Sequence, residues 1–348
     1  IYANMNRKIL TLCLGALLLF SCDNTKKTSK LYDVEGKGGS VAYRVKYIST
    51  DSTDLKPAID SLVKVVDLSI SSYNPESIVS KINQGIETTK VNDHFKNAFA
   101  TAQKVWKESG GFYDPTIGVL VKAWGFGKEP IQPISKLPTE QQIDSLKKYV
   151  GFEKVHISND DYVKKQSPAI QLDLTSVLRG YTVDVISDFL KSKGIENFYV
   201  KVDSEGIVFG RDIVNNTPWK VEAEDPYELN NDYKEVILNL NNESISTDEN
   251  YRRVWIDGNG KRFVHIINPF TGHPMTGEML SATVIAKTAV ESDAYSTMFM
   301  IIGLEKSKEF LAKHPELKAL LVYSDHNNEV KTYKTQNIEP LIVSIAQN

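Results

Sequence analysis

Cysteine is scarce in this sequence. Only two of the 348 residues are cysteines, Cys13 and Cys22, and both lie near the amino terminus. The body of the chain therefore has no cysteine for a disulfide framework or a cysteine-based metal site. An excess of positive charge is also missing, because 41 Lys and Arg residues face 44 Asp and Glu residues, for a net charge of −3. This balance argues against a nucleic-acid partner.

Several widespread catalytic and nucleotide-binding motifs are absent as well. The chain has no Gly-x-Ser-x-Gly elbow, no P-loop and no Gly-x-Gly-x-x-Gly fingerprint. Serine hydrolases, P-loop NTPases and Rossmann dinucleotide-binding folds therefore lose their usual sequence support. Five histidines show no spacing typical of metal ligands, namely His94, His156, His273, His314 and His326.

The composition is that of a folded globular protein. Hydrophobic residues make up 41% of the chain and charged residues 24%, which is enough apolar material for a packed core. The length corresponds to about two domains or to one large domain.

The amino-terminal segment has the pattern of a secretory signal. A short positive region, Asn6-Arg7-Lys8, precedes an apolar stretch from Ile9 to Phe20 and then Ser21-Cys22. This ending resembles the bacterial lipobox, in which the cysteine becomes the first mature residue and carries lipid. We therefore predict a lipoprotein signal peptide over residues 5–21, a lipidated Cys22, and a polar tether over residues 22–40. An anchor helix that is never cleaved is the alternative, although the apolar stretch is short for a membrane span.

The rest of the chain mixes helical and strand patterns without a regular βαβ alternation. This predicts an α+β fold with mixed or antiparallel sheets and packed helices. Thr139 and Gln142 form a capping box for one helix. Other helices are expected from Asp93 to Gly110 and over 177–190, 292–302 and 304–313; strands are expected over 41–48, 197–202, 207–209, 236–240, 252–256, 262–267, 280–286 and 319–323.

Two acidic turns are candidate parts of a site. Asp114-Pro115-Thr116 follows a helix that ends at two glycines, and it places a carboxylate and a hydroxyl on a tight turn. Asp173-Leu174-Thr175-Ser176 precedes a helix, where backbone N–H groups point outward. That second segment can receive a phosphate or can simply cap the helix.

Asp293 and Thr297 form a sharper pair. Residues four apart on a helix share one face, so a carboxylate and a hydroxyl point the same way. Such hard oxygen ligands suit Mg²⁺, while the alternative is an acidic residue that stabilises the first helical turn. His265 lies at the end of an expected strand, where it can be a base, a phosphate donor or a residue without a chemical role.

These pieces match one family in chain order. The sequence resembles the ApbE-type FAD:protein FMN transferases over nearly the whole chain from Val41 onward. We therefore expect residues 41–348 to form a single elaborated ApbE-like domain. The matching blocks are Tyr73-Asn74-Pro75-Glu76-Ser77, Gly110-Gly111-Phe112-Tyr113-Asp114-Pro115-Thr116, Leu172-Asp173-Leu174 with Gly180-Tyr181, His265-Ile266-Ile267-Asn268-Pro269, and Ser292-Asp293-Ala294 with Thr297.

The resemblance implies an enzyme of the bacterial cell envelope that faces the periplasm or the cell exterior. Such an enzyme binds FAD and Mg²⁺, transfers FMN to a Thr or Ser hydroxyl of an acceptor protein, and releases AMP. His265 is the candidate catalytic residue implied by the resemblance. It further implies that Mg²⁺ is held by Ser176, Asp293, Ser296 and Thr297, and that FAD is bound by Tyr73, Phe112, Tyr113, Asp114, Asp173, Arg179 and Ile267.

Three places differ from the usual family pattern: Asp203-Ser204 replaces a Gly-Gly pair, Asp248-Glu249 replaces Ser-Gly, and Asn268 replaces an aspartate. Arg179 occupies the position that is often basic. Added acidic side chains near the site would repel a pyrophosphate unless a cation offsets them. Two other functions therefore stay open, a non-catalytic lipoprotein that binds flavin or protein, and a Mg²⁺-dependent FAD pyrophosphatase.

Overall fold

The computed structural model describes residues 28–86, 88–127, 134, 136–223, 236–250, 254–275, 278–327 and 329–345. The predicted signal peptide and Cys22 lie outside these residues. Within them, the fold is the expected α+β arrangement, and the strands named below pair in an antiparallel manner. No helix of the described ranges combines the length and the apolar character that crossing a bilayer requires.

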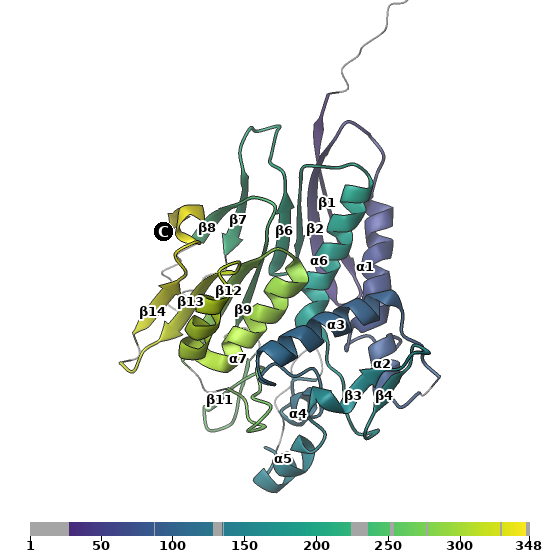
Figure 1. The fold of residues 1–348 in the computed structure, drawn as a ribbon, viewed down its shortest axis with the longest axis vertical. Coiled ribbons are helices and arrows are strands. Elements are labelled where there is room, and N and C mark those ends of the chain that lie inside the picture. Colours follow the sequence, from purple (N-terminus) through teal and green to yellow (C-terminus); the bar gives the residue numbers. More distant parts are fainter. Residues whose placement is uncertain are drawn as a thin grey trace, which may run out of the picture.

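An eight-stranded sheet forms the centre of the domain (Figure 1). Its strand order is β1-β2-β5-β6-β9-β12-β13-β14. The strands are β1 (Lys30–Gly38), β2 (Val41–Ser49), β5 (Phe198–Val202), β6 (Glu205–Phe209), β9 (Ser244–Glu249), β12 (Met279–Ala286), β13 (Lys318–Ser324) and β14 (Val330–Lys334).

Strand β1 corrects the predicted tether. Nine residues that were assigned to the tether of 22–40 pair with β2 in continuous register, from Lys30 opposite Ser49 to Gly38 opposite Val41. The ordered domain therefore begins before residue 41. The sequence of β1 is rich in charged residues because the strand lies at the edge of the sheet and is largely solvent-exposed.

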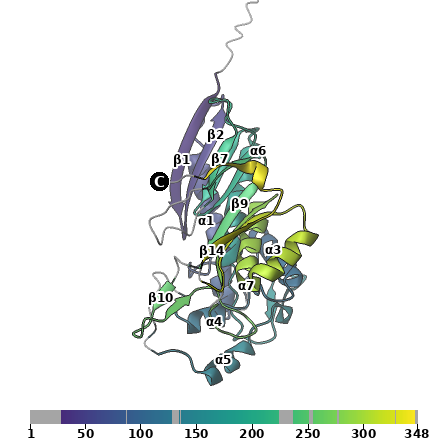
Figure 2. The ribbon, with the colours of Figure 1, turned by 90° about the vertical axis from the view of Figure 1, so that its left-hand side faces the viewer.

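Helices cover one face of the sheet, and a small sheet covers the other (Figures 1 and 2). As a result, β12 is buried on both faces, with Val284 in the core under the helices and Ile285 in the core under the small sheet. The covering elements are the helices α1 (Lys56–Ile70), α3 (Asp93–Glu108), α6 (Thr175–Ser192) and α7 (Ala289–Lys313), and the strands β7 (Trp219–Ala223), β8 (Val236–Leu240) and β15 (Ile342–Ile345).

The remaining elements gather at one end of the molecule, below the sheet in Figure 1. Trp124, Phe126, Trp255 and Phe263 pack in a third apolar cluster there. The elements of this end are α2 (Ile78–Asn83), α4 (Gly118–Ala123), α5 (Glu140–Lys147), a 3₁₀ turn (Phe152–Lys154), β3 (Val155–Ile157), β4 (Val163–Lys165), β10 (Val254–Ile256) and β11 (Arg262–Val264). A second 3₁₀ turn, Glu339–Leu341, precedes β15.

Several local predictions are confirmed. The side chain of Thr139 and that of Gln142 form the complete capping box of α5. Helix α3 begins at Asp93 as expected, and Gly110 and Gly111, both with positive φ, follow its end. The two helices expected around residue 303 are one element, α7, interrupted by Gly303 with φ of 78°.

Candidate functional site

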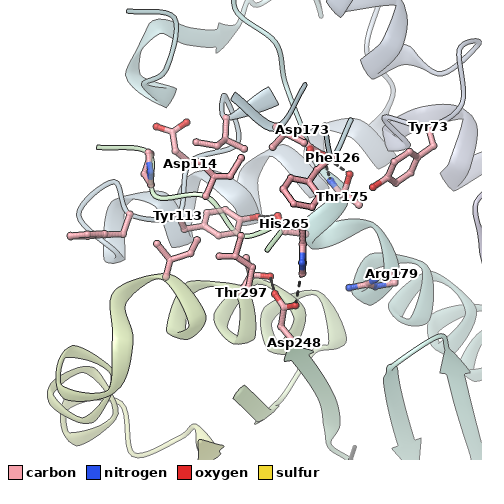
Figure 3. Close-up of a pocket in the computed structure, with 18 residues that line it drawn as sticks. Tyr73, Tyr113, Asp114, Phe126, Asp173, Thr175, Arg179, Asp248, His265 and Thr297 are labelled. Atoms are coloured by element: carbon pink, nitrogen blue, oxygen red, sulfur yellow. Dashed lines mark hydrogen bonds and ion pairs between the residues drawn. The ribbon is translucent and has the colours of Figure 1, made fainter. Parts of the chain in front are cut away.

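A cavity of about 120 Å³ lies between the start of α6, the middle of α7 and the loops beside α4 and β11 (Figure 3). Its wall is mostly apolar, with a few polar groups directed into it. Such a combination is typical of a small-molecule site. The lining residues are Tyr73, Phe112, Tyr113, Asp114, Ile117, Val121, Phe126, Asp173, Thr175, Ser176, Arg179, Asp248, His265, Ile266, Ile267, Pro269, Thr297 and Ile301.

The Asp114 carboxylate is engaged in the turn that carries it. One oxygen accepts hydrogen bonds from the backbone N–H of Thr116 at 2.8 Å and from its hydroxyl at 2.5 Å, and the other accepts from the N–H of Phe152 at 3.1 Å. Burial raises the pKa of the Asp114 carboxyl above its ordinary value. Asp114 therefore shapes the wall, because three donors already hold its carboxylate.

Asp173 organises the beginning of α6. Its Oδ1 accepts hydrogen bonds from the N–H of Thr175 at 3.0 Å, from the Thr175 hydroxyl, and from the Ser72 hydroxyl at 3.2 Å. The next hydroxyl, that of Ser176, lies 2.8 Å from the phenol oxygen of Tyr113. Both Thr175 and Ser176 line the cavity at the amino-terminal turn of the 18-residue helix α6, an end that favours anions.

Arg179 faces a buried acid. Its Nε lies 2.9 Å from Oε2 of Glu205, whose side chain is fully buried in β6. Burial raises the pKa of Glu205 to about 7, and the positive charge of Arg179 opposes that increase. The Arg179 side chain as a whole is 24% exposed and lines the cavity, so it supplies positive charge there.

Asp293 is buried behind the cavity wall. Its Oδ2 accepts a hydrogen bond at 2.9 Å from the backbone N–H of Gly180. Burial, and then the negative charge of Glu205, raises the pKa of the Asp293 carboxyl well above its ordinary value. The approach of α7 to α6 needs a glycine at this point, because a Cβ on Gly180 would lie 2.2 Å from the carbonyl oxygen of Ala289.

Thr297, Asp248 and His265 meet inside the cavity (Figure 3). The Thr297 hydroxyl donates to Oδ2 of Asp248 at 2.8 Å, and Nε2 of His265 lies 3.8 Å from the other carboxylate oxygen. These three side chains come from α7, β9 and the segment after β11. The sheet therefore brings together residues that are up to 49 positions apart in the sequence.

The structure places most of the predicted site residues on one cavity. Two of the four expected metal ligands do not line it, Asp293 and Ser296. The Ser296 hydroxyl donates to the backbone oxygen of Asp293 at 2.8 Å and lies 3.1 Å from the hydroxyl of Ser246. The predicted residues that do line the cavity are Tyr73, Phe112, Tyr113, Asp114, Asp173, Ser176, Arg179, His265, Ile267 and Thr297.

Sequence analysis missed two polar residues of this region as members of a site. Asp248 was noted only as a difference from the family pattern, although its carboxylate contacts Thr297 inside the cavity. Glu205 is not among the residues that the sequence patterns singled out, although it is the ion-pair partner of Arg179. The sequence signal that could have identified Glu205 is an acid directly before the apolar run Gly-Ile-Val-Phe of a strand, because a buried acid needs a partner.

Two other differences from the family pattern are accommodated locally. Asp203 occupies the β5–β6 turn with φ of 49°, and its side chain accepts a hydrogen bond from the N–H of Ala42 at 3.3 Å. The side chain of Asn268 accepts from the N–H groups of Phe270 and Thr271 at 2.9 and 3.2 Å. An aspartate oxygen can accept the same two bonds, so the local turn needs no aspartate.

The donors around Asp293 fit a hard cation in their chemistry. Four carboxyl groups, those of Glu205, Asp293, Asp248 and Asp203, act on Arg179, so acidic side chains outnumber this cation in the region. The hydroxyls of Thr297 and Ser176 add neutral oxygen donors, which Mg²⁺ accepts. Across the described ranges, no group of three or more His, Cys, Asp or Glu side chains has the geometry of a metal site.

Comparison with known proteins agrees with this architecture. The model of the ApbE family matches residues 39–321. A FAD:protein FMN transferase of Haemophilus influenzae is 28% identical over 337 residues, covering 94% of this chain and 96% of that protein. A FAD:protein FMN transferase of Escherichia coli K12 is 29% identical, covering 95% and 96% of the two chains.

A solved structure shares the fold. The flavin transferase ApbE from Vibrio cholerae superposes with a TM-score of 0.80 at 27% sequence identity, covering 90% of this chain and all of that one. The match of the family model, the order of the sequence blocks and the cavity that gathers them lead to one conclusion: this chain belongs to the ApbE family.

Proposed function

We propose that this protein transfers FMN from FAD to a hydroxyl group of an acceptor protein and releases AMP. The observation that carries this proposal is the cavity itself, which gathers residues of five separate ApbE-like sequence blocks. The names of the relatives, FAD:protein FMN transferase, support it.

The reaction is an attack at phosphorus. The acceptor Thr or Ser oxygen forms a bond to the phosphorus of the FMN half, and the bond from that phosphorus to the bridging oxygen breaks. AMP leaves with the bridging oxygen, and the hydroxyl proton passes to a base. Catalysis of such a step depends mainly on positioning and on stabilising negative charge.

Residues of this chain supply both contributions. In this proposal, Arg179 and the first turn of α6, which line the cavity, bind the pyrophosphate with a side-chain cation and backbone N–H groups. The apolar wall near Phe112, Phe126 and Ile267 offers a dry surface for a ring of FAD. His265 is the candidate base, since its Nε2 is directed toward Asp248 at the cavity.

We propose Mg²⁺ as the cation of this site. Asp293, Thr297 and Ser176 supply oxygen donors, while Ser296 joins them only if its hydroxyl turns away from Ser246. When bound, the cation supplies neutralisation of the pyrophosphate charge.

Mass spectrometry of a mixture of purified, defined components tests the proposed reaction. Folded mature protein is incubated with FAD, Mg²⁺ and an acceptor protein that carries the Thr or Ser target, and the acceptor is expected to gain the mass of one FMN. Thr297→Ala is expected to lose this activity. Thr101→Ala, which removes an exposed hydroxyl on α3, is the matched control and is expected to keep it.

Other products would identify the alternatives. Free FMN together with AMP would indicate a FAD pyrophosphatase, with water as the nucleophile. An unmodified acceptor and intact FAD, in a sample that binds flavin, would indicate a non-catalytic binding protein. Titration calorimetry with Mg²⁺ alone tests the metal independently, and Asp293→Asn is expected to weaken that binding.

We also propose that Cys22 carries the lipid that holds the protein at the bacterial cell envelope, facing the periplasm or the cell exterior. The signal-like segment before Cys22 supports this proposal. Replacing Cys22 with Ser is expected to move the expressed protein from the membrane fraction to the soluble fraction. Retention of this variant in the membrane would refute the lipid anchor.

A further inference from the structure

A buried carboxylate outside the cavity connects two segments that approach it. Asp67, near the end of α1, is 2% exposed. Its Oδ1 accepts hydrogen bonds from the backbone N–H of Ser40 at 3.0 Å and from the Ser40 hydroxyl at 2.8 Å. Its Oδ2 accepts from the side-chain amide of Asn74 at 2.6 Å. Asp67 therefore joins the β1–β2 turn to the loop between α1 and α2.

That loop carries Tyr73, which lines the cavity (Figure 3). The Ser71 hydroxyl lies 3.1 Å from the hydroxyl of Ser40 and accepts a hydrogen bond from the N–H of Tyr73 at 3.3 Å. Asn74, which follows Tyr73 in the sequence, donates its side-chain amide to Asp67. The backbone is thus held on both sides of Tyr73 by groups that converge on Asp67 and Ser40.

The same loop also contacts the start of α6. The Ser72 hydroxyl donates to the Asp173 carboxylate at 3.2 Å. An open groove of about 850 Å³ runs beside these contacts, and its lining includes Ser40, Asp67, Asn74 and Tyr73. Tyr73, Thr175 and Arg179 line both the groove and the cavity, so a movement of the loop that carries Tyr73 would change the shape of both.

The β1–β2 turn is shaped to fit against Asp67. Gly39 has φ of +58°, and a Cβ at this position would lie 2.1 Å from Cγ of Asp67. Only glycine lets the turn approach the carboxylate this closely. The backbone N–H and the hydroxyl of Ser40, the side-chain amide of Asn74 and one glycine therefore surround a single acid, which does not line the cavity.

From this geometry we infer that Asp67 is a positioning residue for flavin binding: through Ser40 and Asn74 it holds the Ser71–Ser77 loop so that Tyr73 faces the ligand. The inference rests on the proposed function, in which Tyr73 belongs to the FAD site. Asp67 itself touches no substrate atom in this scheme. Its effect is on the affinity for FAD, since an ordered loop loses less freedom when the ligand binds.

A swap of the two side chains tests the inference. In Asp67→Asn, an amide N–H group faces the amide of Asn74, and in Asn74→Asp, two carboxylates face each other. The double variant restores a carboxylate–amide pair, because Asn at 67 can accept from Ser40 and donate to Asp at 74. Asp at 74 can also keep the bond that Asn74 Oδ1 now accepts from the N–H of Glu76.

Flavin fluorescence gives the dissociation constant for FAD at a temperature at which circular dichroism shows every variant to be folded. Each single variant is expected to raise this constant about tenfold, which corresponds to about 1.4 kcal/mol, and the double variant to bring it back near the wild-type value. In the transfer reaction, KM for FAD is expected to rise in each single variant while kcat at saturating FAD stays close to wild type. Asp60→Asn removes a half-buried acid of the same helix that pairs with Lys56 and keeps an oxygen that can accept from the Tyr43 hydroxyl; this variant is the control and is expected to bind FAD as wild type does.

Two results would overturn the inference while leaving the proposed function intact. The first is wild-type FAD affinity in a folded single variant, and the second is a folded double variant that stays as weak as the singles. If a single variant does not fold, Ser71→Ala replaces it, since this change removes the link from Ser40 to the N–H of Tyr73 and is expected to raise the dissociation constant too. Wild-type protein that binds FAD without transferring FMN would refute only the proposed reaction, and wild-type protein that binds no FAD would refute both.

Discussion

Removal of the Arg179 charge should destabilise the fold strongly. Arg179→Met keeps a long apolar side chain but leaves Glu205 without its cation. Glu205 is fully buried, and breaking such a pair from one side costs about 3–5 kcal/mol because a buried charge is left uncompensated. Asp293, Asp248 and Asp203 also act on Arg179, so the change removes the cation that faces four acidic groups.

Glu205→Leu and the double variant of Arg179 and Glu205 together measure the energy of the Arg179–Glu205 interaction. Glu205→Leu removes the buried charge and leaves an arginine that keeps 24% of its side-chain exposure, so its cost should be smaller, about 1–3 kcal/mol. The double variant replaces the pair with apolar groups, which is often neutral or stabilising. We therefore expect the two single costs to exceed the double cost by at least about 2 kcal/mol.

Urea denaturation at pH 8 measures these free energies of unfolding. EDTA in all samples removes divalent cations, so that metal binding does not contribute. Single costs that add up to the double cost within about 0.5 kcal/mol would refute the reasoning, because they would mean that Arg179 and Glu205 do not depend on each other.

Three further predictions concern stability. Burial raises the pKa of Glu205 from its ordinary 4.5 to about 7. Between these two pH values the folded state therefore holds more protons than the unfolded state. The Glu205 contribution to the free energy of unfolding should fall by about 3 kcal/mol as pH rises from 4.5 to 7. Urea denaturation of Glu205→Gln should show a flatter pH dependence over that range, and an unchanged slope would contradict the prediction. Thr139→Ala should lower the free energy of unfolding by about 1 kcal/mol through loss of the α5 cap and leave FMN transfer unchanged. Ser145→Ala in the same helix is the control. Its exposed hydroxyl donates to the backbone oxygen of Gln141, and its loss should have almost no effect on stability. Lys165→Met should cost about 1–3 kcal/mol in thermal or urea unfolding, since its ammonium donates to the carbonyl oxygens of Ile82, Pro168 and Ile170; full stability of this variant would show that these carbonyls need no partner.

Helices with a clear apolar stripe could be predicted because their apolar residues recur with the period of the helix, which also decides which residues are buried. Phe95, Phe99 and Ala102 recur at helical spacing and are buried in α3. Strand β1 could not be recognised in the same way. Its sequence, KLYDVEGKG, is polar because the strand is exposed at the sheet edge, and only its pairing with β2 identifies it.

The site shows the same limit at the level of side chains. The spacing of Asp293 and Thr297 correctly places both on one side of α7, yet Thr297 lines the cavity while Asp293 bonds to the N–H of Gly180. That contact depends on how closely α6 packs against α7, which is a long-range property. The partnership of Arg179 with Glu205 likewise arises when β6 lies beside α6, and neither sequence segment reveals it alone.

Because β1 is part of the sheet, the linker between a lipid at Cys22 and the folded domain is shorter than the predicted tether. With residues 30–38 in the sheet, seven residues, Asp23 to Ser29, separate Cys22 from the fold, and even fully extended they reach about 25 Å. The first residue of β1 lies at the upper end of the molecule in Figure 1, whereas α4 and the first turn of α6, which border the cavity, lie toward the other end. An anchored enzyme would therefore stand close to the bilayer with its flavin cavity turned outward, and an acceptor in the same membrane would have to extend its target hydroxyl well above the lipid surface to be modified.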